Sequence, residues 1–211
     1  MKPYKTLITR SEDEFIINKS RFIGHGCPCE TEEEALKFLA EMREKYKDAS
    51  HNCYAYIIGT NMGIMRYSDD GEPGGTAGMP IIEVLKARGV TNCCCVVTRY
   101  FGGVLLGAGG LVRAYTKGAV AALDACGVGV MHPTYRILMD VSYPMLSKIE
   151  YHLASQPVII EEKTFTDVVT LTLLVKDIDE EKLIKTIVDI SEGTIEPMRF
   201  DEFYRAWPEE E

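Results

Sequence analysis

The chain has 211 residues, of which 46% are hydrophobic and 26% are charged, and its formal net charge is −9. This composition is typical of a globular protein and argues against a disordered or fibrous chain. No segment approaches the roughly 18 consecutive apolar residues of a membrane-spanning helix, and the first residues lack the apolar core of a signal peptide. We therefore expect a cytoplasmic protein with no membrane contact.

The first half of the sequence predicts a mixture of strands and helices. Residues 4–9 and 14–27 have the pattern of extended chain. A capping box at residues 31–34 opens a helix whose apolar positions recur at helical spacing. Two further strands are expected at residues 53–58 and 64–67, joined by a turn.

A glycine-rich loop, SDDGEPGGTAGMP, follows at residues 68–80. We expect Thr76 to cap the next helix, with Pro80 in its first turn and Gly89 just past its end. This loop and a second one at residues 99–115 together hold 9 of the 18 glycines of the chain. Such a concentration indicates that the two loops have a function or an unusual backbone geometry.

The first loop also concentrates acidic residues. Asp69, Asp70 and Glu72 place three carboxylates within four residues, and with His51 they are the candidate catalytic residues if the protein is an enzyme. A Mg²⁺ ion that bridges these carboxylates to a bound phosphate is one alternative. The simpler alternative is that Asp69 and Asp70 accept hydrogen bonds from the backbone of their own turn. No other cofactor is expected.

A short apolar run at residues 93–97 predicts a strand that is buried on both faces. It leads into the second loop, RYFGGVLLGAGGLVRAY, and then into a helix at about residues 109–126. On that helix Arg113 and Lys117 lie four residues apart, on the side opposite the apolar positions. No acidic residue occurs from 84 to 123, so this stretch is locally basic.

The second loop predicts a site for phosphate groups. A glycine-rich turn before a helix presents backbone N–H groups and the positive end of the helix dipole to an anion. The spacing is not that of a known nucleotide loop, because Ala108 stands where a P-loop has lysine. The alternative is that the glycines serve only tight turns and close strand–helix approach. The candidate phosphate-binding or nucleic-acid-binding residues are Arg99, Gly102, Gly103, Gly107, Gly109, Gly110, Arg113 and Lys117.

The chain contains seven cysteines, three of which are consecutive in an apolar run. An odd number in this arrangement argues against a disulfide framework and indicates reduced thiols that act as small hydrophobic side chains. A zinc site is an alternative use of some of these cysteines and the nearby histidines. Their CxC and HxC spacings lack the CxxC spacing of structural zinc loops, so no metal site is expected. The residues concerned are His25, Cys27, Cys29, His51 and Cys53.

The character of the chain changes near residue 134. Residues 1–134 contain 15 basic and 15 acidic residues, whereas residues 135–211 contain 8 and 17, so all the excess acidity lies in the last third. The elements expected after this point follow the order βαββαβ, which is the ferredoxin-like pattern. We therefore predict an α+β protein with two domains, 1–134 and 135–211.

Six motifs, which together span most of residues 18–126, resemble the YigZ/IMPACT family. The resemblance implies that the N-terminal domain has the fold of the second domain of ribosomal protein S-five, shared with domain IV of elongation factor G and with the GHMP kinases. It also implies that the C-terminal domain is similar to domains III and V of elongation factor G. Eukaryotic relatives regulate translation by interfering with activation of a stress kinase. The motifs are Ser20-Arg-Phe22, His51-x-Cys53-x-Ala55, Ser68-Asp-Asp-Gly-Glu-Pro73, Gly75-Thr-Ala-Gly78, Arg99-Tyr-Phe-Gly-Gly103 and Leu106-Gly-Ala-Gly-Gly-Leu-Val-Arg-Ala-Tyr115.

Three functions follow from these features. The first is a non-catalytic protein of translation or its stress regulation, which binds RNA or ribosome phosphates through the second loop and its helix. The second is an enzyme that acts on a phosphorylated small molecule or nucleotide, with a phosphate loop similar to that of the GHMP kinases. The third is a protein-interaction module, which requires an exposed apolar patch. We favour the first; the sequence leaves the particular RNA or protein partner and the oligomeric state open.

Overall fold

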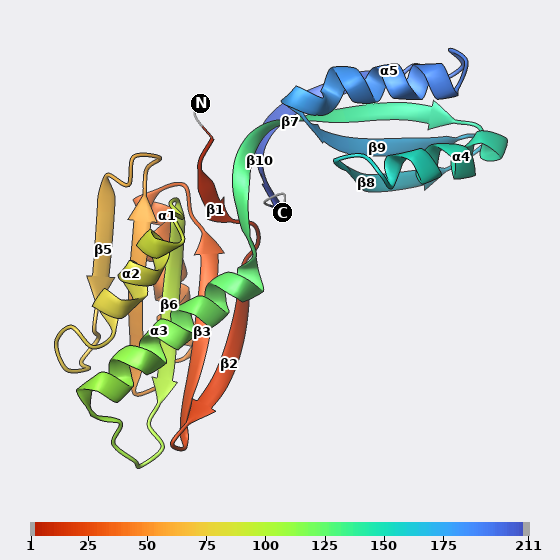
Figure 1. The fold of residues 1–211 in the computed structure, drawn as a ribbon. Helices are drawn as coiled ribbons and strands as arrows, with labels where there is room; N and C mark the ends of the chain where they lie inside the picture. The colour runs from red at the N-terminus through yellow and green to blue at the C-terminus, as the bar shows by residue number, and fades with distance from the viewer. Residues whose placement is uncertain (1–2, 209–211) are drawn as a thin grey trace. The chain divides into compact units, whose positions relative to one another are not determined.

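The computed structural model describes residues 3–208. The described residues form two compact units: the first holds residues 3–131 together with 206–208, and the second holds residues 132–205 (Figure 1). Both units combine helices with antiparallel sheets, so the predicted α+β class is confirmed. Within the described residues, no helix is long and apolar enough to cross a membrane.

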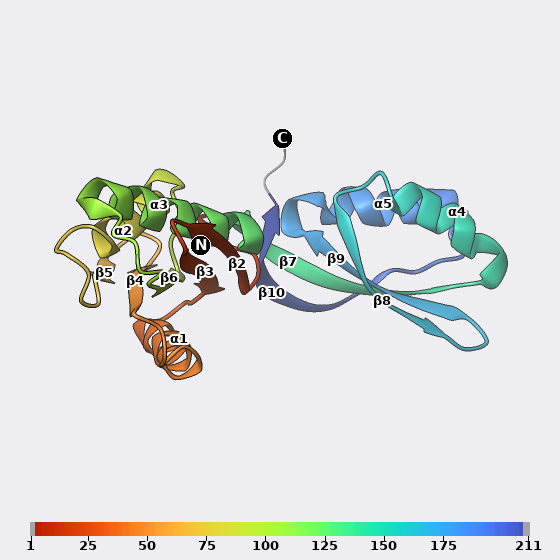
Figure 2. The ribbon, with the colours of Figure 1, turned by 90° about the horizontal axis from the view of Figure 1, so that it is seen from below.

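The N-terminal unit is built on a five-stranded sheet in the order β2-β3-β6-β4-β5, in which every neighbouring pair is antiparallel. Helix α1 covers one face of this sheet, and helices α2 and α3 cover the other (Figure 2). The elements are β2 (Ser11–Ile17), β3 (Ser20–Pro28), α1 (Glu32–Lys45), β4 (His51–Ile58), β5 (Ile64–Ser68), α2 (Gly78–Ala87), β6 (Cys93–Tyr100) and α3 (Gly107–Cys126).

Strand β6 lies in the middle of this sheet and is buried on both faces, as its apolar run predicts. Cys93 and Cys95 belong to the core under α2 and α3, whereas Cys94 and Val96 belong to the core under α1. The division follows from the strand itself, because successive side chains point to opposite faces of a sheet. One strand thus joins two hydrophobic cores.

All seven cysteines are free thiols, and only Cys27 is not fully buried. Burial raises the pKa of Cys93, Cys94 and Cys95, so these thiols stay neutral and pack as small apolar groups. Cys27 differs from them, because a hydrogen bond with Cys29 lowers its pKa.

The segment expected to be one extended stretch at residues 14–27 is two strands joined by a tight turn. Asn18 and Lys19 have positive φ angles of 45° and 66°, and Ile17 pairs directly with Ser20 across the turn. Positive φ at both central positions is the requirement of a type I′ turn, one of the common two-residue hairpin turns. The alternating pattern continues through the turn, so periodicity alone did not reveal the break.

The C-terminal unit has the element order βαββαβ, so the ferredoxin-like prediction is confirmed. Its strands form a sheet in the order β10-β7-β9-β8, and a core of Ile, Leu and Val side chains lies between this sheet and its two helices. The short strand β1 (Lys5–Leu7) pairs with the beginning of β7. The elements are β7 (Val128–Val141), α4 (Tyr143–Leu153), β8 (Val158–Phe165), β9 (Val169–Lys176), a 3₁₀ turn (Asp177–Asp179), α5 (Glu180–Ile190) and β10 (Met198–Pro208).

Candidate functional site

The carboxylate of Asp69 caps helix α2. Its two oxygens accept hydrogen bonds from the amides of Gly75 (2.9 Å), Ala77 (3.0 Å) and Gly78 (2.8 Å). The prediction that Thr76 is the cap is therefore wrong. The Thr76 hydroxyl instead donates to the carbonyl of Pro73 at 2.6 Å. The loop folds back so that an acid nine residues before the helix start reaches the free amides that every helix N-terminus leaves.

Replacing Asp69 with alanine is expected to lower the free energy of unfolding by about 1–2 kcal/mol at neutral pH, the usual effect of losing a helix cap. Burial opposes ionisation of Asp69, but the hydrogen bonds from Gly75, Gly78 and Ala77 outweigh it and lower the pKa of the carboxyl. A depressed folded-state pKa stabilises the fold fully above the unfolded value of about 3.9. This stabilisation is lost as the pH falls through the lower folded value.

Urea unfolding of the wild type and the Asp69→Ala variant between pH 7 and pH 2.5 measures this effect. The difference between the two proteins should be constant above about pH 5 and shrink below about pH 3.9. Asp167→Ala is the control, because Asp167 is exposed and accepts no hydrogen bond within the described part of the chain. A difference that persisted unchanged at pH 2.5 would contradict the role of the ionised carboxylate.

The other two acids of the first loop point to different partners. Asp70 accepts a hydrogen bond from the amide of Asn52 at 2.6 Å, and its carbonyl oxygen lies 2.8 Å from Nδ1 of His51. Glu72 is paired with Arg99. In the described residues, no three His, Cys, Asp or Glu side chains come together in a way that suits a metal ion. We therefore do not retain the magnesium interpretation for these carboxylates.

Glu72 forms the centre of a buried polar cluster. Its Oε1 accepts a hydrogen bond from Nη1 of Arg99 and another from the hydroxyl of Tyr115, both at 2.7 Å. The side chains of Glu72 and Arg99 are only 3% and 6% exposed. Burial, with the neighbouring Cys53 and Glu72, raises the pKa of Tyr115, so the phenol is a neutral donor.

Arg99 is not available for an external phosphate, which corrects the sequence-based expectation. Its guanidinium also lies over the rings of Phe22 and Phe101, at 5.5 Å and 5.4 Å from the two centroids. The register of β3 and β6 sets Phe22 directly opposite Arg99. The charge is therefore enclosed by aromatic rings and neutralised by Glu72.

The first half of the loop between β6 and α3 is also committed to internal contacts. The amides of Phe101 and Gly102 donate to the hydroxyls of Ser50 (3.0 Å) and Ser20 (3.2 Å). Gly102 is required for close approach, since a Cβ there would lie 2.0 Å from the carbonyl carbon of Lys19. We therefore do not retain Gly102 as a phosphate ligand.

The second half of that loop, up to the start of α3, is mainly exposed to solvent. Helix α3 begins at Gly107 without a side-chain cap and without an acidic residue in its first turn. Gly107, Ala108 and Gly109 are exposed, Gly110 is half-buried, and Gly103 is exposed earlier in the loop. The first amides of a helix lack intrahelical partners, so this end of α3 offers free N–H groups and the positive end of the dipole.

Arg113 and Lys117 lie on the exposed side of α3, as their spacing predicts. Lys117 places its Nζ 4.5 Å from the ring centroid of Phe15. In the described part of the chain, neither side chain forms an ion pair with an acid. Both positive charges therefore face solvent on the helix whose N-terminus is uncapped.

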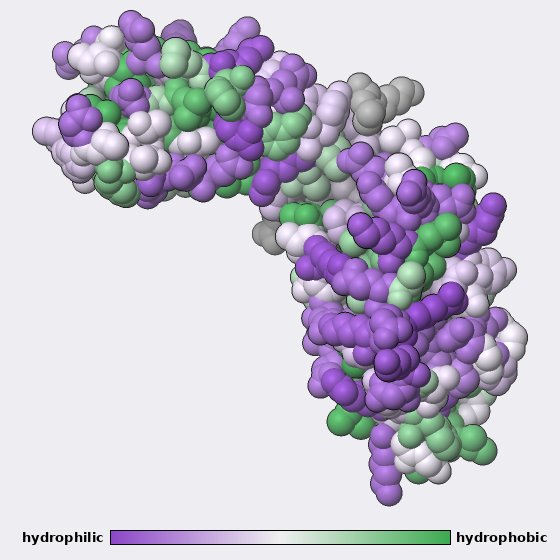
Figure 3. Space-filling model, turned by 180° about the vertical axis from the view of Figure 1, so that it is seen from behind, coloured by the Kyte–Doolittle hydropathy of each residue, from purple (hydrophilic) through white to green (hydrophobic). Residues whose placement is uncertain are grey.

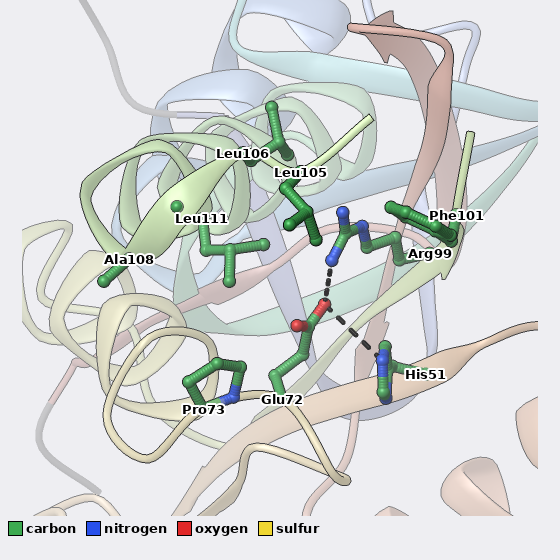
Figure 4. Close-up of a pocket in the computed structure, with 10 residues that line it drawn as sticks. His51, Glu72, Pro73, Arg99, Phe101, Leu105, Leu106, Ala108 and Leu111 are labelled. Carbon is green, nitrogen blue, oxygen red and sulfur yellow. Dashed lines mark hydrogen bonds and ion pairs between the residues drawn. The ribbon is translucent and has the colours of Figure 1, made fainter. Parts of the chain in front are cut away.

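A pocket of about 370 Å³ lies where the two glycine-rich loops meet (Figure 4). One wall carries the polar groups His51, Glu72 and Arg99, and the rest of the lining is mainly apolar. His51 comes from the start of β4, Glu72 from the first loop and Arg99 from the end of β6. The full lining is His51, Glu72, Pro73, Arg99, Phe101, Leu105, Leu106, Gly107, Ala108 and Leu111.

The residues that line this pocket lie within a part of the chain that matches a known protein family. Residues 18–123 match the Impact N-terminal domain, and residues 139–194 match a domain of unknown function, DUF1949. The chain belongs to the IMPACT family. The member YvyE of Bacillus subtilis is 40% identical over 191 residues, which cover 90% of this chain and 88% of that protein.

Other relatives of this IMPACT family member extend the comparison. Escherichia coli YigZ is 32% identical over 188 residues, covering 88% of this chain and 92% of YigZ. Rat Protein IMPACT is 35% identical over 94 residues, covering 42% of this chain and 29% of that protein. A solved structure described as a hypothetical protein has 30% identity and a TM-score of 0.60, and the match covers 95% of this chain and 98% of the other.

Sequence reasoning on this IMPACT family member missed Tyr115 and the apolar wall of the pocket. Tyr115 lies on the apolar side of α3, where its spacing indicates only a core residue. Phe101 and Leu105 lie in the loop between β6 and α3 and are 48% and 84% exposed. In Figure 3, apolar side chains gather at the end of the N-terminal unit to which this loop belongs. Exposed apolar residues beside a glycine-rich turn were the available signal.

Proposed function

We propose that this IMPACT family member is a non-catalytic regulator in translation or its stress response, and that it binds RNA or ribosome phosphates through α3. Family membership supports the translation-related regulatory role. The phosphate-binding surface consists of Gly103, Gly107, Gly109 and Gly110 with Arg113 and Lys117; we name it the α3 basic surface. The observation that carries the proposal is the uncapped N-terminus of α3 beside two solvent-facing cations.

The charge distribution supports the same surface. No acid lies between residues 84 and 123, although the chain carries a net charge of −9. A local basic patch on an acidic protein orients a polyanion toward that patch and away from the rest of the molecule. The acidic C-terminal unit then faces solvent or a protein partner.

Reversal of both charges, in the variant Arg113→Glu/Lys117→Glu, is expected to weaken RNA or ribosome binding by at least about tenfold at low salt. Each lost phosphate contact should make the plot of log K against log salt less steep by about 0.7 to 0.9. Fluorescence anisotropy with structured RNA and sedimentation with ribosomes, both from 50 to 300 mM salt, measure the affinity and the slope.

The matched control is Lys182→Glu/Lys185→Glu on α5, which makes the same change in net charge on two exposed lysines of the other unit. Its affinity and salt slope should stay close to those of the wild type. The proposal is rejected if wild-type binding is absent or independent of salt, or if both double variants lose affinity equally.

A second candidate function is a protein-interaction module. The observation that favours it is the exposure of Phe101, Val104 and Leu105 in the loop before α3. A Val104→Ser variant separates the two candidates, because Val104 is exposed but does not line the pocket and serine adds no charge. It should leave binding to purified RNA unchanged, and a loss of ribosome association in this variant alone would favour a protein contact.

A further inference from the structure

One carboxylate oxygen of Glu72 has no hydrogen-bond donor within the described part of the chain and faces the pocket. Oε1 of Glu72 is occupied by Arg99 and Tyr115, whereas Oε2 has no hydrogen-bond partner among the described residues. Figure 4 shows this second oxygen turned away from Arg99, toward the part of the pocket lined by Pro73 and Leu111. An ionised carboxylate oxygen only accepts hydrogen bonds, so at this position the pocket is matched to a ligand that provides a donor.

His51 adds a second acceptor to the same wall. Its Nδ1 lies 2.8 Å from the carbonyl oxygen of Asp70, and a carbonyl only accepts, so the neutral imidazole carries its proton on Nδ1. Nε2 then presents a lone pair 3.9 Å from Oε1 of Glu72, and the side chain is 25% exposed. Two acceptors side by side select a hydrogen-bond donor.

The charges around the pocket favour a neutral hydroxyl donor over a positively charged ammonium donor. Arg99 already neutralises Glu72, and the positive end of the α3 dipole lies at Gly107 and Ala108 on the pocket lining. An ammonium group would add a charge of the same sign to this environment, whereas a hydroxyl adds none. The amides of α3 favour an anionic group on the same ligand, at the rim of the pocket.

The rest of the pocket lining is mainly apolar. Phe101, Leu105, Leu106 and Leu111 line the pocket together with the acceptors, and one side of the Phe101 ring is covered by Arg99. An exposed aromatic ring and aliphatic side chains suit the flat or apolar body of a small molecule. The volume of about 370 Å³ lies within the range of roughly 300 to 1,000 Å³ that is typical of ligand pockets.

We propose that this pocket binds a phosphate monoester that carries two neighbouring hydroxyl groups and an apolar or aromatic body. One hydroxyl donates to Oε2 of Glu72, a neighbouring hydroxyl donates to Nε2 of His51, and the phosphate lies against the N-terminus of α3. A nucleoside 5′-monophosphate has this chemistry when it is free, and as the 5′-terminal nucleotide of an RNA it keeps the phosphate and one of the two hydroxyls. The site goes beyond the α3 basic surface: it shares the α3 N-terminus and uses neither Arg113 nor Lys117.

Calorimetric titration of the full chain tests the proposed chemistry group by group. The probes are adenosine 5′-monophosphate, adenosine, inorganic phosphate and 2′,3′-dideoxyadenosine 5′-monophosphate. The monophosphate should bind, and each of the other three should bind at least about tenfold more weakly, because each lacks the phosphate, the body or the hydroxyl donors. Absent binding of the monophosphate, or equal binding of the dideoxy analogue, would overturn the proposal.

Two substitutions at Ala108 test whether the ligand binds in this pocket. Ala108→Glu puts a carboxylate into the first turn of α3, where a negative charge stabilises a helix, so the variant is expected to fold. It should lose monophosphate binding at least about tenfold through repulsion of the phosphate. Ala108→Gln has nearly the same size without the charge and should lose less. Wild-type affinity in Ala108→Glu would place the ligand elsewhere and overturn the assignment.

The ligand is either a free nucleotide or the 5′ end of an RNA. Binding of the same RNA oligonucleotide with and without a 5′-phosphate distinguishes these two cases. If the pocket takes an RNA end, the phosphorylated oligonucleotide binds more tightly and adenosine 5′-monophosphate competes for the difference. If it takes a free nucleotide, the two oligonucleotides bind equally and the nucleotide still binds. Lys117→Glu should weaken both oligonucleotides and leave nucleotide binding unchanged. Nucleotide binding without RNA binding therefore rejects the proposed function alone, and the reverse rejects the pocket ligand alone.

Discussion

Replacement of Glu72 by leucine is expected to lower the free energy of unfolding by about 3–5 kcal/mol, because it leaves the guanidinium of Arg99 buried without its partner. Both side chains are almost fully buried, and Tyr115 also loses its acceptor. Leucine is similar in size to glutamate, so the effect reports the lost charge rather than a cavity. Urea or thermal unfolding followed by circular dichroism measures it.

Two further variants separate the ion pair from the rest of the cluster. In Glu72→Leu/Arg99→Met both charges are absent, and the free energy of unfolding should recover most of the loss, as it does when a buried pair is replaced by apolar side chains. Tyr115→Phe removes one hydrogen bond to Glu72 and should lower the free energy by about 1 kcal/mol. A Glu72→Leu variant that unfolds within 1 kcal/mol of the wild type would show that Arg99 finds water or another partner, against the structure.

Replacement of Gly102 by alanine is expected to lower the free energy of unfolding by about 2–3 kcal/mol, the typical effect of forcing an extra carbon into a packed site. The added Cβ would meet backbone atoms of Lys19 at 2.0 and 2.1 Å and the amide nitrogen of Ser20 at 2.4 Å. Backbone cannot move aside as a flexible side chain does. The strain falls on the contact that holds the loop before α3 against the β2–β3 hairpin.

Gly74 provides the matched control for this substitution. A Cβ at Gly74 has no atom within 4 Å, and the residue has no positive φ. Gly74→Ala should therefore raise the free energy of unfolding by about 0.4–1 kcal/mol, by reducing the freedom of the unfolded chain. Equal losses in both variants would mean that glycine is needed throughout these loops for flexibility, and not at Gly102 for packing.

Regular elements of the fold followed from the sequence because their signals are local. The apolar run of β6 predicts burial on both faces, and the two cores on either side of the sheet account for it. The four-residue spacing of Arg113 and Lys117 places them on the solvent side of α3, where they lie. The βαββαβ order of the C-terminal unit also follows from local periodicity alone.

The partners of the charged residues could not be predicted, because they depend on strand register and loop path. Arg99 stands in a basic stretch, but its neighbour in space is Glu72, which is 27 residues earlier in the chain. Thr76 is a good cap by residue type, yet Asp69 reaches the amides of α2 from the other side of the loop. Sequence therefore identified the two loops that form the pocket, and the structure decided which of their groups are occupied.

The burial of the cysteines determines which thiol of the folded protein can react with a reagent in solution. Six of the seven thiols are enclosed in the two cores, and the one that reaches solvent, Cys27, has a lowered pKa and so a larger share of the nucleophilic thiolate form. An alkylating reagent meets a single reactive sulfur in the folded protein. The remaining six are shielded from oxidants for as long as the sheet stays closed.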